Sequence, residues 1–203
     1  MVERTMSILR KPQPEEKHVT QLVAAARQDP QVFGELYLLY AQPVFRYLHS
    51  RIGSFPEAED ATAQTFLAAL ERFPNYHHDG YFASWLFSIA RNKAMDYFRQ
   101  QRKQTALDEA ELIPAEANLL QQVIKTERTA ALSKLIGTLP EEERELIRLR
   151  YVAELSFAEI GHLLRQKEDT VKKSLYRLLA RLKVQADKEH PADKEHPMED
   201  SYV

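Results

Sequence analysis

The sequence predicts an all-α protein of two small helical domains joined by a flexible linker, and three observations support this prediction. Apolar residues recur at the spacing of a helix, whereas Val and Thr do not alternate with polar residues over any long run. Only 5 glycines occur in 203 residues, which also favours helices over sheets. Residues 104–119 contain Pro114 and lack a clear period, so we expect a linker at 104–124 to separate a domain at 18–103 from one at 125–184.

Both ends of the chain are predicted to lie outside these domains. Residues 1–17 are polar, contain Pro12 and Pro14, and are expected to form a loose arm. Residues 185–203 form a charged tail in which the sequence Ala-Asp-Lys-Glu-His-Pro occurs twice in succession. Two copies of so short a unit are too few for a solenoid and indicate a solvated segment.

The composition excludes several classes of protein. Hydrophobic residues make up 44% of the chain, which is enough for packed cores. The absence of cysteine excludes disulfides and thiolate metal sites and fits a reducing compartment. No apolar run approaches the ~18 residues of a membrane span, and no secretory signal follows Met1, so we expect a cytoplasmic protein without membrane insertion.

Neither a metal site nor an active site is expected. His77 and His78 lack acidic or Cys partners at metal-ligand spacing, and they are interpreted as a solvated loop pair. Asp, Glu, His and Ser do not cluster in a way that suggests catalytic roles. The sequence therefore predicts a protein that is not an enzyme and carries no cofactor.

Charge is segregated along the chain, although the net charge is only −2. Residues 91–103 carry five basic side chains and one acidic, a local net charge of +4. Residues 165–183 carry seven basic side chains and two acidic, a local net charge of +5. Two separate basic segments of this kind indicate contact with nucleic acid at two places.

Four helices are expected in the first domain, at about residues 19–28, 33–52, 54–73 and 82–103. Pro43 is expected to kink or split the second helix, and Gly53 is expected to end it. Ser54 and Glu57 match a capping box that would open the third helix. The fourth helix combines an apolar stripe with a basic face on a different side.

The second domain is expected to contain a helix-turn-helix. Helices are predicted at about residues 120–137 and 141–152, and a second capping box, Ser156 with Glu159, opens a short helix that ends near Leu164. The buried side of the final basic helix is marked by Val171, Leu175, Leu178 and Leu182. A short helix, a turn and a longer basic helix form the arrangement that places the last helix in the major groove of DNA.

The outer face of this last helix is suited to DNA contact. Away from the apolar stripe lie Asp169, Lys172, Lys173 and Tyr176, with Arg177 and Arg181 along the flank. Lysine can contact guanine edges or phosphates, and the two arginines are placed for phosphate contact. The alternative is an ordinary amphipathic helix with a solvated basic face. The capped helix and turn before it favour DNA.

The helix at 82–103 and the loop before it combine aromatic and basic side chains. The aromatic residues are Phe73, Tyr76, Tyr81, Phe82 and Trp85, and the basic segment follows them. This mixture suits single-stranded or melted nucleic acid, because unstacked bases meet aromatic faces while the backbone meets cations. Asn92 offers an amide that can read a base edge, whereas Trp85 taken alone is expected in the core.

Five motifs, in this order and spacing, resemble the extracytoplasmic-function (ECF) sigma factors, a family of small two-domain bacterial initiation factors. The motifs are Phe33-x-x-Leu36-Tyr37-x-x-Tyr40, Ala58-Glu59-Asp60 to Phe66-Leu67, Trp85-Leu86-x-x-Ile89-Ala90-Arg91-Asn92-x-x-x-Asp96, Leu139-Pro140 with Leu149-Arg150-Tyr151, and Ser156-Phe157-x-Glu159-Ile160 with Thr170-Val171-Lys172. The resemblance covers roughly residues 18–103 and 125–183. Each motif alone is weak, and their combination is specific.

By this resemblance, the protein would bind core RNA polymerase and direct promoter-specific initiation by recognising and melting promoter DNA. The resemblance implies contact with the polymerase flap, and with the clamp helices of the largest subunit through Asp60, Gln64, Phe66, Leu67 and Leu70. It implies that the minus-ten element is bound by Phe73, Tyr76, Arg91, Asn92, Lys93, Arg99 and Arg102. It implies that the minus-thirty-five element is read by Thr170, Lys172, Lys173, Tyr176, Arg177 and Arg181. An anti-sigma factor is a further partner that the resemblance allows.

The turn of the helix-turn-helix departs from the family pattern. Arg165 and Lys167 replace the usual Gly and capping Ser, and Asp169 replaces a common Gly. We therefore expect the fold to be retained and the promoter preference to be unusual.

Two alternatives remain open. A conventional helix-turn-helix regulator would bind duplex DNA without polymerase, and it explains residues 139–183 but not the aromatic and basic helix. A helical adaptor would bind polymerase or another protein but not DNA, and its binding would depend little on salt.

Overall fold

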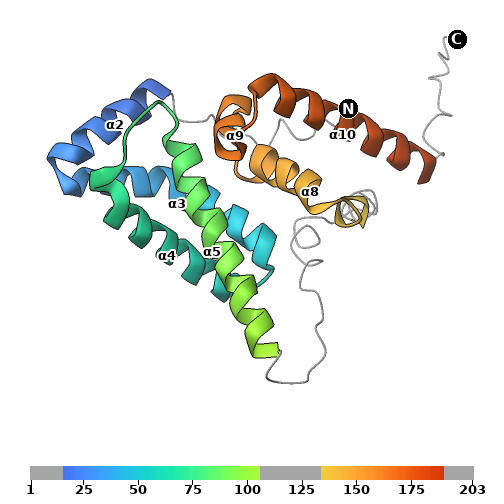
Figure 1. Ribbon diagram of the computed structural model, residues 1–203, viewed down its shortest axis with the longest axis horizontal. Helices are drawn as coiled ribbons and strands as arrows, with labels where there is room; N and C mark the ends of the chain where they lie inside the picture. Colours follow the sequence, from blue (N-terminus) through green and yellow to red (C-terminus); the bar gives the residue numbers. More distant parts are fainter. Residues whose placement is uncertain (1–15, 106–133, 190–203) are drawn as a thin grey trace, which may run out of the picture.

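The computed structural model describes residues 16–105 and 134–189, and all regular secondary structure in these two stretches is helical (Figure 1). The predicted all-α class is confirmed. We call residues 16–105 the N-terminal domain and residues 134–189 the C-terminal domain. Most of the predicted arm, linker and tail lies outside the described residues, as does most of the helix expected at 120–137.

The N-terminal domain contains four α-helices and two single turns of 3₁₀-helix. These are α2 (Glu16–Gln28), η1 (Pro30–Val32), α3 (Phe33–Ile52), α4 (Phe55–Arg72), η2 (Phe73–Asn75) and α5 (Phe82–Thr105). Helix α3 contacts each of the other three α-helices, and its side chains Leu36, Val44 and Leu48 are fully buried. The four helices predicted for this domain are therefore present, close to their expected ends.

Helix α3 continues without a break through Pro43, so the expected split does not occur. Leu36 before the proline and Val44 and Leu48 after it are all buried in one core, and such packing contributes most of the stability of a helix in a protein. Gly53 ends α3 as predicted. Its φ of 81° lies in the left-handed region that favours glycine.

The capping box expected at Ser54 and Glu57 does not form. Ser54 precedes α4, but its side chain makes no capping hydrogen bond. An N-cap hydroxyl accepts a hydrogen bond from the second or third N–H of the helix. Pro56 occupies the second position of α4 and has no N–H, so one of these two donors is missing.

The C-terminal domain contains α8 (Glu141–Ile147), the π-helical turn η4 (Arg148–Val152), α9 (Phe157–Leu164) and α10 (Glu168–Glu189). Helix α10 packs against both α8 and α9. Its predicted apolar stripe is confirmed, since Val171, Leu175, Leu178 and Leu182 are at most 4% exposed. The π-helical turn differs from the regular helix expected to Val152. The Ala153 N–H bonds to the Arg148 carbonyl five residues back, at 2.9 Å.

The two domains contact each other directly, which the sequence did not predict. Helix α9 lies beside α5, and η4 lies beside α3 (Figure 1). Leu149, Leu155 and Ile160 of the C-terminal domain join the buried cluster that forms the core of the N-terminal domain. Within the described residues, no helix has the length and apolar character that a bilayer crossing requires.

Candidate nucleic-acid interface

Helix α9, the turn after it and α10 form the predicted helix-turn-helix. The Ser156 hydroxyl accepts a hydrogen bond from the Glu159 N–H at 3.2 Å, and the Glu159 carboxylate accepts one from the Ser156 N–H at 2.7 Å. This confirms the second capping box. In the turn, the Gln166 N–H donates to the Gly161 carbonyl at 2.8 Å, and Arg165 adopts a left-handed φ of 56°. The arginine therefore adopts the backbone conformation that glycine usually supplies there.

At Gly161 the backbone of α9 lies close to the turn that follows the helix. A Cβ atom at this position would lie 2.8 Å from the Gln166 carbonyl oxygen, closer than real Cβ atoms approach a neighbour. The absence of a side chain therefore allows the chain to reverse direction before α10.

The outer face of α10 is accessible. The side chains predicted to read duplex DNA that are exposed are Thr170, Lys172, Lys173, Tyr176, Arg177 and Arg181. The ring of Tyr176 also packs against that of Phe157 of α9, with ring centroids 6.0 Å apart. Arg181 pairs with Glu143 of α8, so its charge is already partly neutralised. Among the described residues, Lys172, Lys173 and Arg177 form no ion pair, so the first turns of α10 present the larger basic surface.

Two of the aromatic residues predicted to contact the melted strand are buried instead. Phe73 packs edge-on against Phe33 with centroids 5.1 Å apart, and Tyr76 stacks on Trp85 at 4.4 Å. Phe73 is 5% exposed and Tyr76 6% exposed. Burial also raises the pKa of the Tyr76 hydroxyl, helped by nearby Asp79. In this arrangement both rings support the loop from inside rather than offering a face to a base.

The basic face of α5 is partly accessible. Asn92, Arg99 and Arg102 are exposed, and Lys93 is half-buried. Arg99 forms a surface ion pair with Asp96 at 3.1 Å. Such exposed pairs contribute little to stability, and a phosphate can replace the carboxylate. Arg91 differs from the others because it faces the C-terminal domain.

The Asp60 helix, α4, presents a mixed polar and apolar surface. Gln64 donates a hydrogen bond to Asp60 at 2.6 Å, and both residues are exposed. Leu67 and Leu70 are 60% and 45% exposed. Phe66, in contrast, is 6% exposed and packs against Tyr37 at 4.8 Å. Phe66 therefore supports Tyr37 from the core in this structure, and its contact with the polymerase stays a prediction.

Sequence reasoning missed three exposed apolar side chains on α3 and α4. Tyr37 and Leu38 of α3 are 45% and 78% exposed, and Phe55 at the start of α4 is 53% exposed. Leu38 lies outside the apolar stripe of α3, and this position in the sequence could have predicted its exposure. Tyr37 is one of several apolar residues at helical spacing in α3, so the structure was needed to show that it is exposed.

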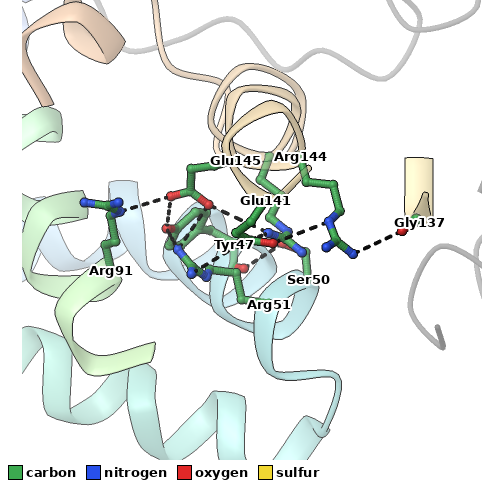
Figure 2. Close-up of polar contacts among 9 residues, drawn as sticks. Tyr47, Ser50, Arg51, Arg91, Gly137, Glu141, Arg144 and Glu145 are labelled. Carbon is green, nitrogen blue, oxygen red and sulfur yellow. Dashed lines mark hydrogen bonds and ion pairs between the residues drawn. The ribbon is translucent and has the colours of Figure 1, made fainter. Parts of the chain in front are cut away.

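A buried carboxylate between the domains was also missed (Figure 2). Glu145 of α8 is 4% exposed and accepts hydrogen bonds from the Tyr47 hydroxyl at 2.7 Å and from Arg51 at 3.1 Å. Arg91 of α5 also pairs with Glu145, and its Nε lies 3.5 Å from Oε1, the same oxygen that accepts from Tyr47. Burial, followed by the Glu145 charge, raises the pKa of Tyr47, so the hydroxyl remains a donor. Glu145 lies one helical turn before Leu149, a weak sequence signal for burial.

Comparison with known proteins decides the family. The Sigma-70 region 2 family matches residues 36–104, and the Sigma-70 region 4 family matches residues 129–182. The ECF RNA polymerase sigma factor SigM of Bacillus subtilis is 31% identical over 154 residues, which are 73% of this chain and 91% of SigM. The chain belongs to the ECF RNA polymerase sigma factors. A second relative, BldN of Streptomyces coelicolor, is 33% identical over 154 residues, and the match spans 58% of its length.

Solved structures show the same fold as this sigma factor. CnrH, in complex with the cytosolic domain of CnrY, has a TM-score of 0.59 and 23% identity, over 83% of this chain and 96% of that one. RpoE of Bartonella quintana, in complex with NepR, has a TM-score of 0.60 and 18% identity, over 80% of this chain and 98% of that one. The helical architecture of both domains is therefore found in both of these solved structures.

Proposed function

We propose that this sigma factor binds core RNA polymerase and directs promoter-specific transcription initiation by recognising and melting promoter DNA. The observation that carries the proposal is the capped helix-turn-helix, from which α10 exposes Lys172, Lys173 and Arg177. Initiation of this kind needs no catalytic residue in the sigma factor, because the polymerase performs the phosphodiester chemistry. It also places the protein in the cytoplasm.

The upstream element is read as duplex DNA by the N-terminal half of α10. Lys172, Lys173 and Tyr176 are exposed on its outer face, while Val171 and Leu175 anchor the opposite face. This anchoring fixes the helix orientation, so that its exposed side chains can enter the major groove. Arg177 and Arg181 are placed to contact phosphates, which position the protein without reading sequence.

The downstream element is bound as a melted strand by α5 and the loop before it. Asn92 supplies the amide for a flipped base, and Lys93, Arg99 and Arg102 follow along the helix as phosphate contacts. Phe73 and Tyr76 hold the loop in place from the core. Arg91 joins this set once it is released from Glu145.

Helix α4 is the proposed contact to the clamp helices of the polymerase. Leu67 and Leu70 expose apolar surface beside the polar pair of Asp60 and Gln64. Exposed apolar side chains with a polar border are typical of protein interfaces. The C-terminal domain would contact the flap, and an anti-sigma factor is a further proposed partner.

Run-off transcription tests this proposal. Purified core polymerase and this chain would be incubated with genomic DNA that includes the region upstream of its own gene. We expect discrete transcripts that disappear when the chain is omitted. Duplex binding by the chain alone, without transcripts, would favour a conventional regulator. Polymerase binding without DNA contact would favour the adaptor.

A further inference from the structure

The loop between η2 and α5 lies along helix α2 (Figure 1). Arg27, near the end of α2, donates a hydrogen bond to the carbonyl of Tyr76. Two residues further along the loop, the Nε2 atom of His78 lies 3.0 Å from the hydroxyl oxygen of Thr20. The loop and the helix therefore run in opposite directions, because later residues of the loop meet earlier residues of the helix.

A third contact joins the end of the loop to the start of α2. Gly80 has a φ of 88°, and a Cβ atom added there would lie 2.9 Å from Glu16 Oε1. Alternate positions of the loop, 76, 78 and 80, are thus in contact with the helix. Their partners Glu16, Thr20 and Arg27 lie on one face of α2, since residues four and seven apart share a side of a helix.

His78 is hydrogen-bonded on both sides of its ring. The Thr20 hydroxyl donates its one proton to the Glu16 carbonyl at 2.9 Å, so it accepts a proton from His78 Nε2. The other ring nitrogen, Nδ1, lies 3.0 Å from the Tyr76 hydroxyl and accepts from it. Burial raises the pKa of that hydroxyl, so it keeps its proton. A continuous series of hydrogen bonds therefore connects the buried Tyr76 through His78 to α2.

The residues between the anchored positions remain at the surface. His77 and Asp79 have exposed side chains, whereas the carbonyl of Tyr76 and the ring of His78 are held by α2. A site that accepts one base and rejects others needs groups held in one geometry, and supporting residues behind the site supply it. Helix α2 is placed to give this support, although it contains none of the proposed DNA contacts.

We propose that α2 is a positioning element for promoter recognition. Through Glu16, Thr20 and Arg27 it holds the loop at residues 76–80, and it thereby determines how strictly the sigma factor selects a base of the minus-ten element. This inference rests on the proposed function, in which this loop and α5 bind the melted strand. A loop without these anchors would still hold the strand through the cations of α5, but it would discriminate less between bases.

Substitutions at both ends of the loop test the proposal. Thr20 is exposed, so Thr20→Val removes its hydroxyl while keeping the size and branching of the side chain, and Thr20→Ser keeps the hydroxyl. Gln21→Val is the matched control, because it introduces the same valine at the next exposed position, about 100° around α2. Arg27→Ala breaks the contact with the Tyr76 carbonyl, and Gln28→Ala is its control.

The first measurement is run-off transcription by the full chain with core polymerase. Four templates would differ only at the position of the minus-ten element where the native chain discriminates most. We expect Thr20→Val and Arg27→Ala to narrow the preference for the best base by about threefold to tenfold, the range that one lost hydrogen bond allows. Thr20→Ser should keep the native preference. Binding to an upstream-element duplex should not change, since α10 reads that element.

Tryptophan fluorescence is a second measurement that needs neither polymerase nor DNA. Trp85 is the only tryptophan of the chain, is half-buried, and stacks on Tyr76 with ring centroids 4.4 Å apart. Release of the loop from α2 would expose Trp85 to solvent. We therefore expect acrylamide to quench its fluorescence more strongly in Thr20→Val and Arg27→Ala than in Thr20→Ser and the two controls.

An unchanged base preference in both Thr20→Val and Arg27→Ala would overturn the proposal, whether or not quenching increases. A loss of preference that Gln21→Val shares, or that Thr20→Ser also shows, would overturn it as well, because the hydroxyl would not be the cause. Failure of the proposed function looks different. The native chain would then give no promoter-dependent transcript, while quenching would still show whether α2 holds the loop.

Discussion

Asn92 is the residue whose surroundings fit best with recognition of a base. It is exposed on α5 and lies beyond the part of the helix that α9 contacts through Ser84. We predict that Asn92→Ala slows open-complex formation by about tenfold or more while closed-complex binding changes little, because a lost base contact costs ~1–3 kcal/mol. Permanganate reactivity of unpaired thymines would measure melting, and a gel shift at low temperature would measure closed binding.

Gln100→Ala, at another exposed position on α5, is the control for this substitution. Equal losses in closed binding and melting would contradict the role of Asn92. Phe73→Ala is a weaker test because Phe73 is buried, and truncation of a core Phe lowers the free energy of unfolding by ~3–5 kcal/mol. Its effect on melting would be mixed with loss of the fold.

A second prediction at the scale of one residue concerns the contribution of Gly161 to stability. Gly161→Ala would place a methyl group 2.8 Å from the Gln166 carbonyl oxygen, so the turn of the helix-turn-helix must shift. We expect a loss of ~1–3 kcal/mol in the free energy of unfolding, the usual cost of overpacking. Urea unfolding followed by circular dichroism would measure it.

Gly34→Ala is the matched control, because no atom lies within 4 Å of the added Cβ in α3. This substitution should leave stability unchanged or raise it by up to ~1 kcal/mol, since alanine favours a helix over glycine. Similar losses for both substitutions would show that the close approach at Gly161 is not the cause.

At the scale of the element, the start of α9 depends on its cap. Ser156→Ala removes the hydroxyl that accepts the Glu159 N–H, so we predict a loss of about 1 kcal/mol in the free energy of unfolding. Ser54 occupies the same N-cap position before α4 without a capping hydrogen bond, and Ser54→Ala should cost less. Thermal melts of both variants would compare them, and a larger loss for Ser54→Ala would contradict the assignment of the caps.

Exposed basic residues of α10 are predicted to contribute to DNA binding. Lys172→Ala or Arg177→Ala should weaken binding to the upstream element by ~1–3 kcal/mol if the side chain makes a specific base contact, and should reduce the salt dependence if it contacts phosphate. Lys183→Ala is the control, because Lys183 is exposed on the same helix, about 16 Å beyond Lys172 and about 9 Å beyond Arg177 along its axis. Titration of duplex DNA by fluorescence anisotropy at several salt concentrations would measure the effects. Unchanged affinity and salt slope would exclude both roles.

At the scale of the whole molecule, the ionic contact at Glu145 is one of the contacts that hold the domains together, beside the buried Leu149, Leu155 and Ile160. Glu145→Lys would place a cation beside Arg51, Arg91 and Arg148, and an uncompensated charge at a buried site costs several kcal/mol. The domains should therefore separate while each keeps its own core, since Leu175, Leu178 and Leu182 pack within the C-terminal domain. Small-angle X-ray scattering should show a larger radius of gyration.

Glu142→Lys makes the same charge change at an exposed position of α8 and is the control. Circular dichroism should show equal helix content in both variants. If the radius of gyration of Glu145→Lys equals that of the control, the ionic contact does not hold the domains together.

The fold was largely predictable from sequence because helical periodicity and local capping are properties of neighbouring residues. The stripe of α10, the Ser156 cap and the end of α3 at Gly53 were all found in this way. The errors arose where a distant or unusual contact overrode a local rule. Helix α3 continues past Pro43 because residues on both sides of the proline pack in one core. Pro56 has no N–H, so one donor for the expected cap before α4 is missing.

For the candidate site, the sequence indicated which residue types are involved better than it indicated which side chains are exposed. The basic and amide side chains of α5 and α10 lie mostly at the surface, because burying such groups without partners is costly. The burial of Phe66, Phe73 and Tyr76 was not predicted, since an aromatic ring suits both a core and a binding surface. Only their neighbours in space distinguish these two roles.

The sequence by itself determined the helical class, the helix-turn-helix and, through five ordered motifs, the resemblance to sigma factors. These features depend on the period of apolar residues and on side chains close together in the chain. Only the tertiary structure decided which aromatic rings are buried, and that Glu145 meets Tyr47, Arg51 and Arg91. Those contacts join residues on α3, α5 and α8, and packing between helices far apart in sequence brings them together.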